Sequence, residues 1–199
     1  MTMVIKRKKM KKIFVVDCNP KNQSFSLGLF EQYIKGAQEA GHQVKSMHLS
    51  DMEFEIDLAQ KNENDELEPC LVDFQEKLTW CDHVMLVFPL WWGFMPAKTK
   101  GLIDRAFLPQ YAYAYLPDKS LPQKLLAGRS ADILVTSDTP NWYFKWLYRA
   151  GAFKILRMQI FEFVGIKPVK MHMISQLRHS SEKMRLGWLN KAWKLGNQV

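Results

Sequence analysis

Short runs of strand-forming residues alternate along the chain with longer stretches in which apolar residues recur every three or four positions. The strand-like runs cover residues 12–17, 43–49, 84–88, 129–136 and 165–174. Spacings of three and four between apolar residues predict amphipathic helices in the intervening stretches. Five strands that alternate with five helices predict an α/β protein with a parallel sheet and right-handed crossovers.

The most informative stretch is residues 84–107, which reads VMLVFPLWWGFMPAKTKGLIDRAF. Its first five residues are apolar without alternation, as in a central parallel strand that is covered on both faces, and Pro89 ends this strand. The loop that follows brings Trp91, Trp92 and the permissive Gly93 to the carboxyl end of the strand, where open α/β sheets bind their ligands. The two indoles are compatible with simple core packing. Their place in a loop, rather than on a periodic face, favours a site for a flat aromatic ligand.

The loop after the first strand leads directly into a helix. Residues 19–25, NPKNQSF, contain no glycine, so neither a GxGxxG fingerprint nor a P-loop is present. Free amides at the helix start, together with the hydroxyls of Ser24 and Ser26, can bind an anion. Ser24 can equally act as a plain helix cap. From these residues alone, both interpretations stay open.

Positive charge is concentrated near the start of the chain. The net charge of the 199 residues is +8, and six of the positive charges lie within residues 6–12, which leaves +2 for the rest. Because there is no spread basic face and no zinc or helix-turn-helix signature, we expect no nucleic-acid partner. We interpret residues 1–11 as a solvated basic extension and residues 12–199 as a single domain.

The cysteines and the apolar runs indicate in which cellular compartment the protein is expected. Cys18, Cys70 and Cys81 form no CxxC pair and no even framework, which favours a reducing compartment with each thiol as a small buried hydrophobe. No cluster with metal-ligand spacing occurs, so we expect no metal site. The longest nearly apolar run, residues 84–97, is shorter than the roughly 20 residues of a membrane span, and no signal-peptide pattern follows the basic N-terminus. We therefore expect a cytoplasmic protein with no integral membrane segment.

Residues 89–107 resemble the pattern PLWWGxxPAxxKGxIDRxF of the flavodoxin-like NAD(P)H:quinone oxidoreductase family, which comprises DT-diaphorase-like proteins and shorter bacterial relatives. The resemblance extends over nearly the whole chain after the basic extension. It implies a flavodoxin-like three-layer sandwich with a five-stranded parallel sheet in the order 2-1-3-4-5. It also implies a noncovalent flavin, FAD or FMN, with NAD(P)H as co-substrate.

The resemblance further assigns cofactor-binding residues in three loops. The flavin phosphate is expected at Asn19, Gln23, Ser24, Phe25 and Ser26. The flavin ring is expected against Pro89, Leu90, Trp91, Trp92 and Gly93, with Thr136, Ser137 and Asp138 at its pyrimidine edge.

The resemblance supplies three catalytic candidates, Tyr113, Tyr115 and Tyr143. Tyr111, Tyr113 and Tyr115 alternate, which predicts that all three side chains lie on one side of an extended segment. In the family, the equivalents of Tyr113 and Tyr115 reach toward the flavin of the other subunit, which implies a homodimer. The family tyrosine that lines the nicotinamide and quinone site falls near Phe144, or on the neighbouring Tyr143 if the loops differ.

The chain departs from the family pattern at several of these positions. Asn19 replaces a histidine that many relatives carry, and an amide cannot titrate near neutral pH. Residues 136–140, TSDTP, replace a Thr-Thr-Gly-Gly loop. Asp138 would oppose an anionic reduced flavin, so we expect it to turn toward backbone amides or solvent, and we expect Thr139 to cap the next helix. Trp146 replaces the family's active-site histidine.

Together these features predict a flavin-dependent NAD(P)H oxidoreductase that passes two electrons to a quinone or similar acceptor by a ping-pong mechanism. The alternative is a regulatory flavoprotein subunit of a potassium-efflux-type membrane transporter, a role that close relatives have. A binding protein without turnover is a third possibility, which the altered 136–140 loop favours slightly.

Overall fold

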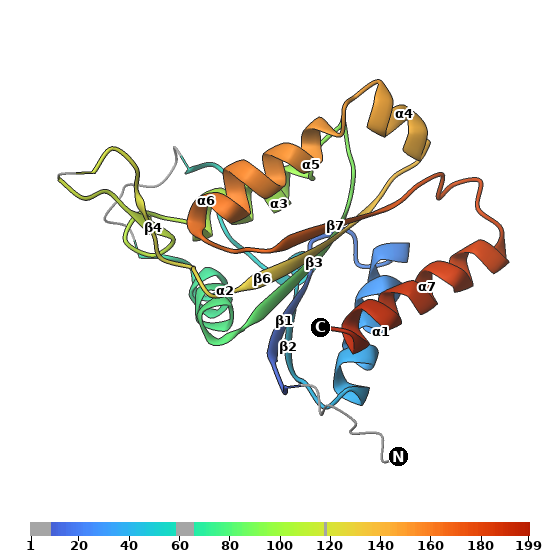
Figure 1. Cartoon of the computed structure of the whole chain (residues 1–199), viewed down its shortest axis with the longest axis horizontal. Helices are drawn as coiled ribbons and strands as arrows, with labels where there is room; N and C mark the ends of the chain where they lie inside the picture. Colours follow the sequence, from blue (N-terminus) through green and yellow to red (C-terminus); the bar gives the residue numbers. More distant parts are fainter. Residues whose placement is uncertain (1–8, 59–65, 118) are drawn as a thin grey trace, which may run out of the picture.

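A five-stranded parallel sheet forms the centre of the computed structural model, which describes residues 9–58, 66–117 and 119–199 (Figure 1). The strand order is β2-β1-β3-β6-β7, which confirms the predicted order 2-1-3-4-5. The strands are β1 (Lys12–Asp17), β2 (Gln43–His48), β3 (His83–Pro89), β6 (Ser130–Thr136) and β7 (Val169–Ile174). The predicted basic extension, residues 1–11, lies mostly outside the described residues.

Two helices cover one face of the sheet. They are α1 (Phe25–Glu39) and α7 (Glu182–Asn197), which run side by side in Figure 1. A Cβ atom on Gly36 would collide with the Trp193 carbonyl, and one on Gly196 would collide with the Tyr33 carbonyl. The two helices therefore pack backbone to backbone, and glycine is required at both crossing positions.

The other face carries α2 (Pro69–Trp80), α3 (Ala97–Ala106) and a segmented helix after β6. That helix consists of α5 (Gly151–Ile155), the π-helical η3 (Leu156–Phe161) and α6 (Glu162–Val164). Its residues Leu156, Phe161 and Val164 join the same apolar core as Leu71, Phe74 and Leu102. Helices on both faces explain why β3 is apolar from Val84 onward and buried from His83 to Phe88.

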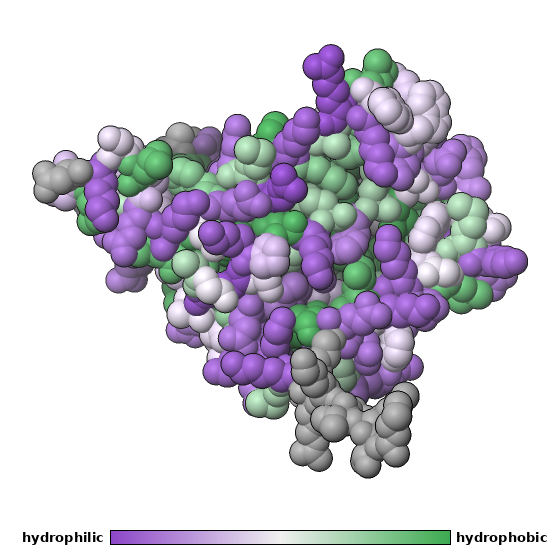
Figure 2. All heavy atoms as spheres, in the orientation of Figure 1, coloured by the Kyte–Doolittle hydropathy of each residue, from purple (hydrophilic) through white to green (hydrophobic). Residues whose placement is uncertain are grey.

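Short elements fill the remaining chain. They are η1 (Leu49–Asp51), the antiparallel pair β4 (Tyr113–Ala114) and β5 (Gln123–Lys124), and α4 (Asn141–Trp146). The last strand begins at Val169 rather than at the predicted residue 165, because Gly165 has φ 103° and closes α6. Most of the face seen in Figure 2 is hydrophilic, with apolar side chains reaching the surface between charged ones.

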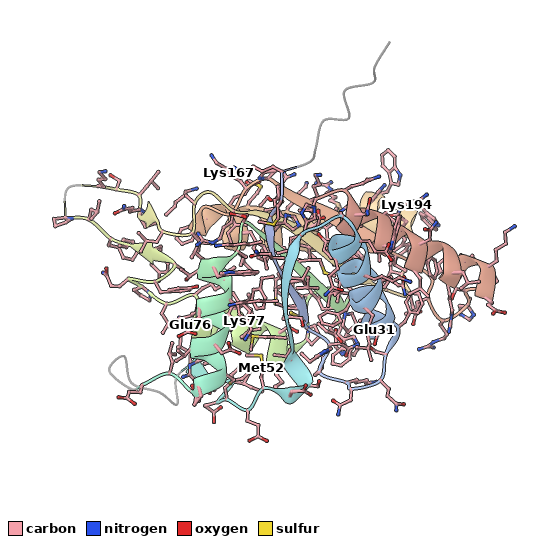
Figure 3. All side chains as sticks on the ribbon, turned by 90° about the horizontal axis from the view of Figure 1, so that it is seen from below. Glu31, Met52, Glu76, Lys77, Lys167 and Lys194 are labelled. Carbon is pink, nitrogen blue, oxygen red and sulfur yellow. The ribbon has the colours of Figure 1, made fainter. Side chains whose placement is uncertain are left out.

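A buried polar network lies near the amino-terminal end of the sheet, the end that Lys167 marks in Figure 3. The Tyr33 hydroxyl lies 2.9 Å from His83 Nε2 and donates to Asp132 Oδ2 at 3.1 Å. His83 Nδ1 lies 2.7 Å from Ser130 Oγ, and His172 Nε2 lies 3.3 Å from Asp132 Oδ1. His83 therefore has a structural role in this network.

The cysteines follow the prediction in two of three cases. Cys18 and Cys81 are buried, whereas Cys70 is partly exposed and its thiol donates to the Glu53 carbonyl at 3.2 Å. Among the described residues all three are free thiols. Within the same part of the chain, the helices are all too short or too polar to span a bilayer.

Candidate functional site

Three loops meet at the carboxyl end of the sheet. They follow β1, β3 and β6, which are neighbours because β3 pairs with β1 on one side and with β6 on the other. The amide of Leu90 donates to the Thr136 carbonyl at 2.7 Å, so the second and third loops are joined where they leave the sheet. The structure thus brings together the three segments that the sequence assigned to one site.

The first loop and the start of α1, residues 19–26, form what we call the anion cradle. Ser24 is the N-cap residue of α1, with extended φ and ψ, and its hydroxyl accepts from the Leu27 amide at 3.3 Å. Capping satisfies one amide, while the other amides of the first turn have no carbonyl partner within the helix. The structure therefore confirms that Ser24 caps the helix, while anion binding at the neighbouring amides stays a prediction.

Asn19 is buried beside the anion cradle and forms hydrogen bonds that hold its loop in place. It is 4% exposed, and its Nδ2 atom donates to Ser26 Oγ at 3.2 Å. Its Oδ1 atom accepts from the Lys21 amide at 3.1 Å, and its own amide donates to Asp17 Oδ1 at 3.1 Å. Asn19 therefore shapes the loop, while Gln23 is exposed and Phe25 is partly buried beside Trp188.

The second loop, residues 89–93, presents an open platform. Trp91 and Phe94 each donate a backbone hydrogen bond to the other, at 2.9 and 3.0 Å, and these two bonds close the loop into a tight turn. Trp92 and Gly93 both have positive φ, 49° and 81°, and the Trp92 side chain is fully exposed. Trp91 is 40% exposed, and the ammonium of Lys21 lies 5.8 Å from the centre of its ring. The indoles are thus surface groups of the site and not core residues.

The third loop begins with Thr136 and Ser137, which are both buried. Ser137 Oγ accepts from the Thr139 amide at 3.0 Å. Asp138 turns away from the site, since its Oδ1 atom accepts from the Arg178 amide at 2.7 Å and its Oδ2 atom lies 3.5 Å from Arg178 Nε. This confirms the expected orientation of Asp138.

The predicted cap of the next helix was wrong by one residue. Helix α4 begins at Asn141 with Pro140 at the N-cap position, and no side chain caps it. The hydrogen bond from the Thr139 amide to Ser137 holds residue 139 in the preceding turn instead of at the helix start.

A pocket of about 480 Å³ lies between the platform and the segment 139–152. Its lining consists of Leu90, Trp92, Gly93, Thr139, Phe144, Tyr148, Gly151 and Ala152. A Cβ atom on Gly93 would meet no protein atom within 4 Å, so the chain leaves open space beside this glycine. The volume falls in the range of small-molecule sites.

Tyr113 and Tyr115 lie away from the pocket beside Gly93. Tyr113 lines a second pocket of about 600 Å³ and packs against Phe163 and Tyr115, with ring centres 5.5 Å apart in each case. Tyr115 is 67% exposed. Within one chain, neither tyrosine lines the pocket beside Gly93.

Tyr111 contradicts the predicted common face of the three alternating tyrosines. Its hydroxyl donates to the Gln75 carbonyl at 2.8 Å, on the side of α2. Gln110 has φ 66°, and residues 110–112 form a turn, so the strict alternation of an extended segment holds only from Tyr113 onward.

The segment 141–150, which we call the lid, holds Tyr143 near the pocket but not in its wall. Tyr143 packs edge-on against Trp142 and Tyr148, with ring centres 5.5 and 5.1 Å away. A hydrogen bond with the Tyr148 hydroxyl raises the pKa of Tyr143. Tyr148 lines the pocket in place of Tyr143, while Trp146 is 81% exposed.

Some lining residues have no sequence signal of their own. Gly151 and Ala152 reach the pocket because Arg149 and Ala150 both have positive φ, which turns the chain sharply between α4 and α5. Phe144 and Tyr148, four residues apart on the aromatic lid, could have been recognised by that helical spacing.

Comparison with solved structures extends over almost the whole chain. Smu.1420 from Streptococcus mutans UA159 is 30% identical, with a TM-score of 0.82, and the match covers 94% of this chain and all of that one. An NAD(P)H:quinone oxidoreductase from Methanothermobacter marburgensis is 21% identical with a TM-score of 0.77, over 95% and 98% of the two chains. An FMN-dependent NADH-azoreductase from Bacillus anthracis, in complex with FMN, is 16% identical with a TM-score of 0.72, over 95% and 99%. The last two likenesses concern the fold.

Two curated proteins match over part of the chain. One is the ribosyldihydronicotinamide dehydrogenase-like protein traD of Penicillium crustosum, 29% identical over 48% of this chain and 43% of its own length. The other is YcaK of Escherichia coli, named an uncharacterised NAD(P)H oxidoreductase, 28% identical over 51% of this chain and 55% of its own. The matches thus span about half the length of each curated relative.

The family comparison covers the sheet, the three loops and most of α7. The model of the family described as having a flavodoxin-like fold matches residues 11–192. This agrees with the strand order and with the position of the three loops. The chain therefore belongs to the family of proteins with a flavodoxin-like fold.

Proposed function

We propose that this protein is an oxidoreductase that binds a flavin, FAD or FMN, and transfers two electrons from NAD(P)H to a quinone or similar acceptor. The observation that carries the proposal is the pocket beside Gly93, which lies between the exposed aromatic platform and the segment 139–152. The names of the curated relatives and of the solved quinone oxidoreductase and azoreductase support the same class of reaction.

The anion cradle fits a flavin phosphate. It offers the free amides at the start of α1, the positive end of the helix dipole and the hydroxyls of Ser24 and Ser26. Lys21 lies in the same loop and contributes a positive charge close to Trp91. These groups would hold the phosphate without the glycine-rich loop of dinucleotide-binding proteins.

The platform and pocket fit a flat ring. Leu90 and Trp92 provide apolar surface, and the backbone at Gly93 leaves room for close approach. Phe144 and Tyr148 form the opposite wall. Because Asp138 is bound to Arg178, its charge does not face the ring position.

Bound there, a flavin would supply the redox chemistry, accepting a hydride from NAD(P)H and delivering two electrons to the acceptor. The chain's own residues bind and orient the reactants and exclude water. The lid covers one side of the pocket, so donor and acceptor would use the same open side in turn. A shared open side is the reason to propose a ping-pong mechanism.

A homodimer would complete the site. Tyr115, Trp142 and Trp146 are 67%, 65% and 81% exposed, which is a large aromatic surface for a monomer to leave in water. Burying one large apolar side chain is worth about 1.5–3 kcal/mol, and a two-fold axis would bury such groups on both subunits. We propose that Tyr113 and Tyr115 of a second copy roof the pocket beside Gly93.

The visible spectrum of the purified protein tests the cofactor, and steady-state kinetics with a soluble quinone test the reaction. We expect bound or bindable FAD or FMN, turnover with NADH or NADPH, and parallel double-reciprocal plots. Intersecting lines without product inhibition would contradict the ping-pong mechanism, and absence of flavin binding would contradict the function.

A further inference from the structure

A carboxylate lies buried directly beneath the anion cradle. Asp17 is the last residue of β1 and is 3% exposed. In register it lies between His48 of β2 and Val87 of β3. A buried negative charge beside a site for a negatively charged group is unfavourable, so its presence there requires an explanation.

The hydrogen bonds that shape the anion cradle form a chain that begins at the Asp17 carboxyl group. Its Oδ1 atom accepts from the Asn19 amide at 3.1 Å, and the Asn19 side chain in turn holds Ser26 Oγ and the Lys21 amide. A change at the Asp17 carboxyl group would therefore be transmitted to the hydroxyl and to the loop that surround the anion.

The groups that face Asp17 leave its charge poorly compensated. From β2, His48 Nδ1 lies 3.9 Å from Asp17 Oδ2, and the His48 ring packs on Phe30 of α1. From its own strand, the neighbouring thiol of Cys18 has a pKa raised by burial and by the Asp17 charge, so it stays neutral. Val87 of β3 is apolar, and Ser26 of α1 reaches the carboxylate only through Asn19.

Burial has a measurable consequence for this carboxyl group. It raises the pKa of Asp17 to about 6, because desolvation outweighs the hydrogen bond from Asn19 and the attraction of His48. Protonation of Asp17 thus falls within the range in which flavin binding can be measured.

We propose that Asp17 is a positioning residue of the anion cradle and that its charge couples binding of the flavin phosphate to proton uptake. The inference rests on the proposed flavin site. A phosphate in the anion cradle disfavours the ionised form of Asp17 and favours the protonated form, which still accepts the hydrogen bond from Asn19. By linkage, affinity falls as pH rises through the range in which Asp17 ionises.

The test is a titration of FAD against pH, between about pH 5 and pH 8, with wild type and Asp17→Asn. FAD is the preferred ligand, since the terminal phosphate of FMN itself titrates near pH 6. We expect the wild-type affinity for FAD to fall by about tenfold over this range, as a one-unit pKa change on binding implies. Asp17→Asn keeps the shape and the acceptor oxygen, so its affinity should stay high and independent of pH.

Two controls separate Asp17 from other sources of a pH effect. His48→Gln removes the nearby imidazole, and the pH dependence should persist in this variant. Riboflavin lacks a phosphate, and its binding to wild type should not change over the same range. A pH dependence that survives in Asp17→Asn, or that disappears in His48→Gln, overturns the proposal.

A carboxyl-carbon NMR titration of the wild type provides a measurement that does not depend on the folding of any variant. The pKa of Asp17 should rise when FAD is added, and an unchanged value overturns the proposal. If FAD binds but the Asp17→Asn profile matches wild type, only this inference fails. If neither FAD nor FMN binds at any pH, the proposed function fails and this inference fails with it.

Discussion

The two ends of the sheet are built in opposite ways. Near the amino-terminal end, Tyr33, His83, Asp132 and His172 are buried or nearly so, and each has a hydrogen-bond partner within the network. At the carboxyl-terminal end, Trp92 is fully exposed at positive φ, next to a pocket of about 480 Å³. In Figure 3, Lys167 marks the first end and Met52 lies toward the second.

The two buried aspartates show the same contrast. Burial alone would raise the pKa of Asp132, but hydrogen bonds from His172 and His83 hold it well below its ordinary value. The same burial effect dominates at Asp17, where a single amide and a more distant His48 compensate less. The polar network at the amino-terminal end is hydrogen-bonded within itself, whereas the carboxyl-terminal end presents an exposed indole beside an open pocket.

The largest difference in stability between the two ends is expected at Asp132. Asp132→Ala leaves two histidines and Tyr33 buried without their shared acceptor, and we expect the free energy of unfolding to fall by about 3–5 kcal/mol. Asp138→Ala is the matched control in the loop after the same strand, because its salt bridge with Arg178 is exposed and is worth about 1 kcal/mol or less. Urea denaturation measures both, and equal losses would show that the two ends do not differ.

Asp17 and Asp132 should affect the pH dependence of the free energy of unfolding in opposite directions. The folded pKa of Asp17 is about 6, above its ordinary 3.8, so the free energy of unfolding should rise as pH falls from about 7 to about 4. The expected gain is up to about 3 kcal/mol, and Asp17→Asn should abolish it. The lowered pKa of Asp132 acts in the opposite sense, with stability lost below about pH 4. A wild type whose stability declines steadily from neutral pH would contradict the account of Asp17.

The tyrosines test whether the open end is completed by a second copy. Replacing Tyr113 and Tyr115 by Ala should lower acceptor turnover by about tenfold or more and leave flavin affinity within about threefold, since the anion cradle lies elsewhere. Tyr111→Phe is the control, because the Tyr111 hydroxyl binds the Gln75 carbonyl and should not affect turnover. Sedimentation of the wild type accompanies the kinetics. An active monomer, or unchanged turnover in the double variant, would exclude a composite site.

The smallest expected effect concerns the stability contribution of the platform. The Trp92 side chain is fully exposed, so Trp92→Ala should change the free energy of unfolding by no more than about 0.5 kcal/mol. A loss of about 2 kcal/mol or more in urea denaturation would show that Trp92 is a core residue and not a surface group kept for a ligand.

The parts of the fold that local sequence patterns specify were predicted well. Residues 84–107 contain a strand, a loop and a helix in immediate succession, and the structure has β3, the platform and α3 there. The order of the sheet follows from the alternation of strands and helices and from the family resemblance. The orientation of Asp138 followed from its charge alone.

What the sequence did not reveal depends on single backbone angles and on contacts between distant residues. One residue at φ 66°, Gln110, separates Tyr111 from the other tyrosines. The two-residue strands β4 and β5 are too short for a periodic signal. Tyr33 and Asp132 are 99 residues apart and meet only after the sheet and α1 have packed. The pocket wall at Gly151 and Ala152 likewise depends on the turn at Ala150.

The most direct test of the central claim is a titration of intrinsic tryptophan fluorescence with FAD and FMN, using Trp92→Ala and Trp146→Ala as a matched pair. Both indoles are exposed, but only Trp92 lines the pocket beside Gly93. We expect saturable quenching in wild type and in Trp146→Ala, and an affinity about tenfold lower in Trp92→Ala, the loss expected for one stacking aromatic ring. No saturable change with either flavin, or equal affinities in the two variants, would contradict a flavin site at the carboxyl end of the sheet.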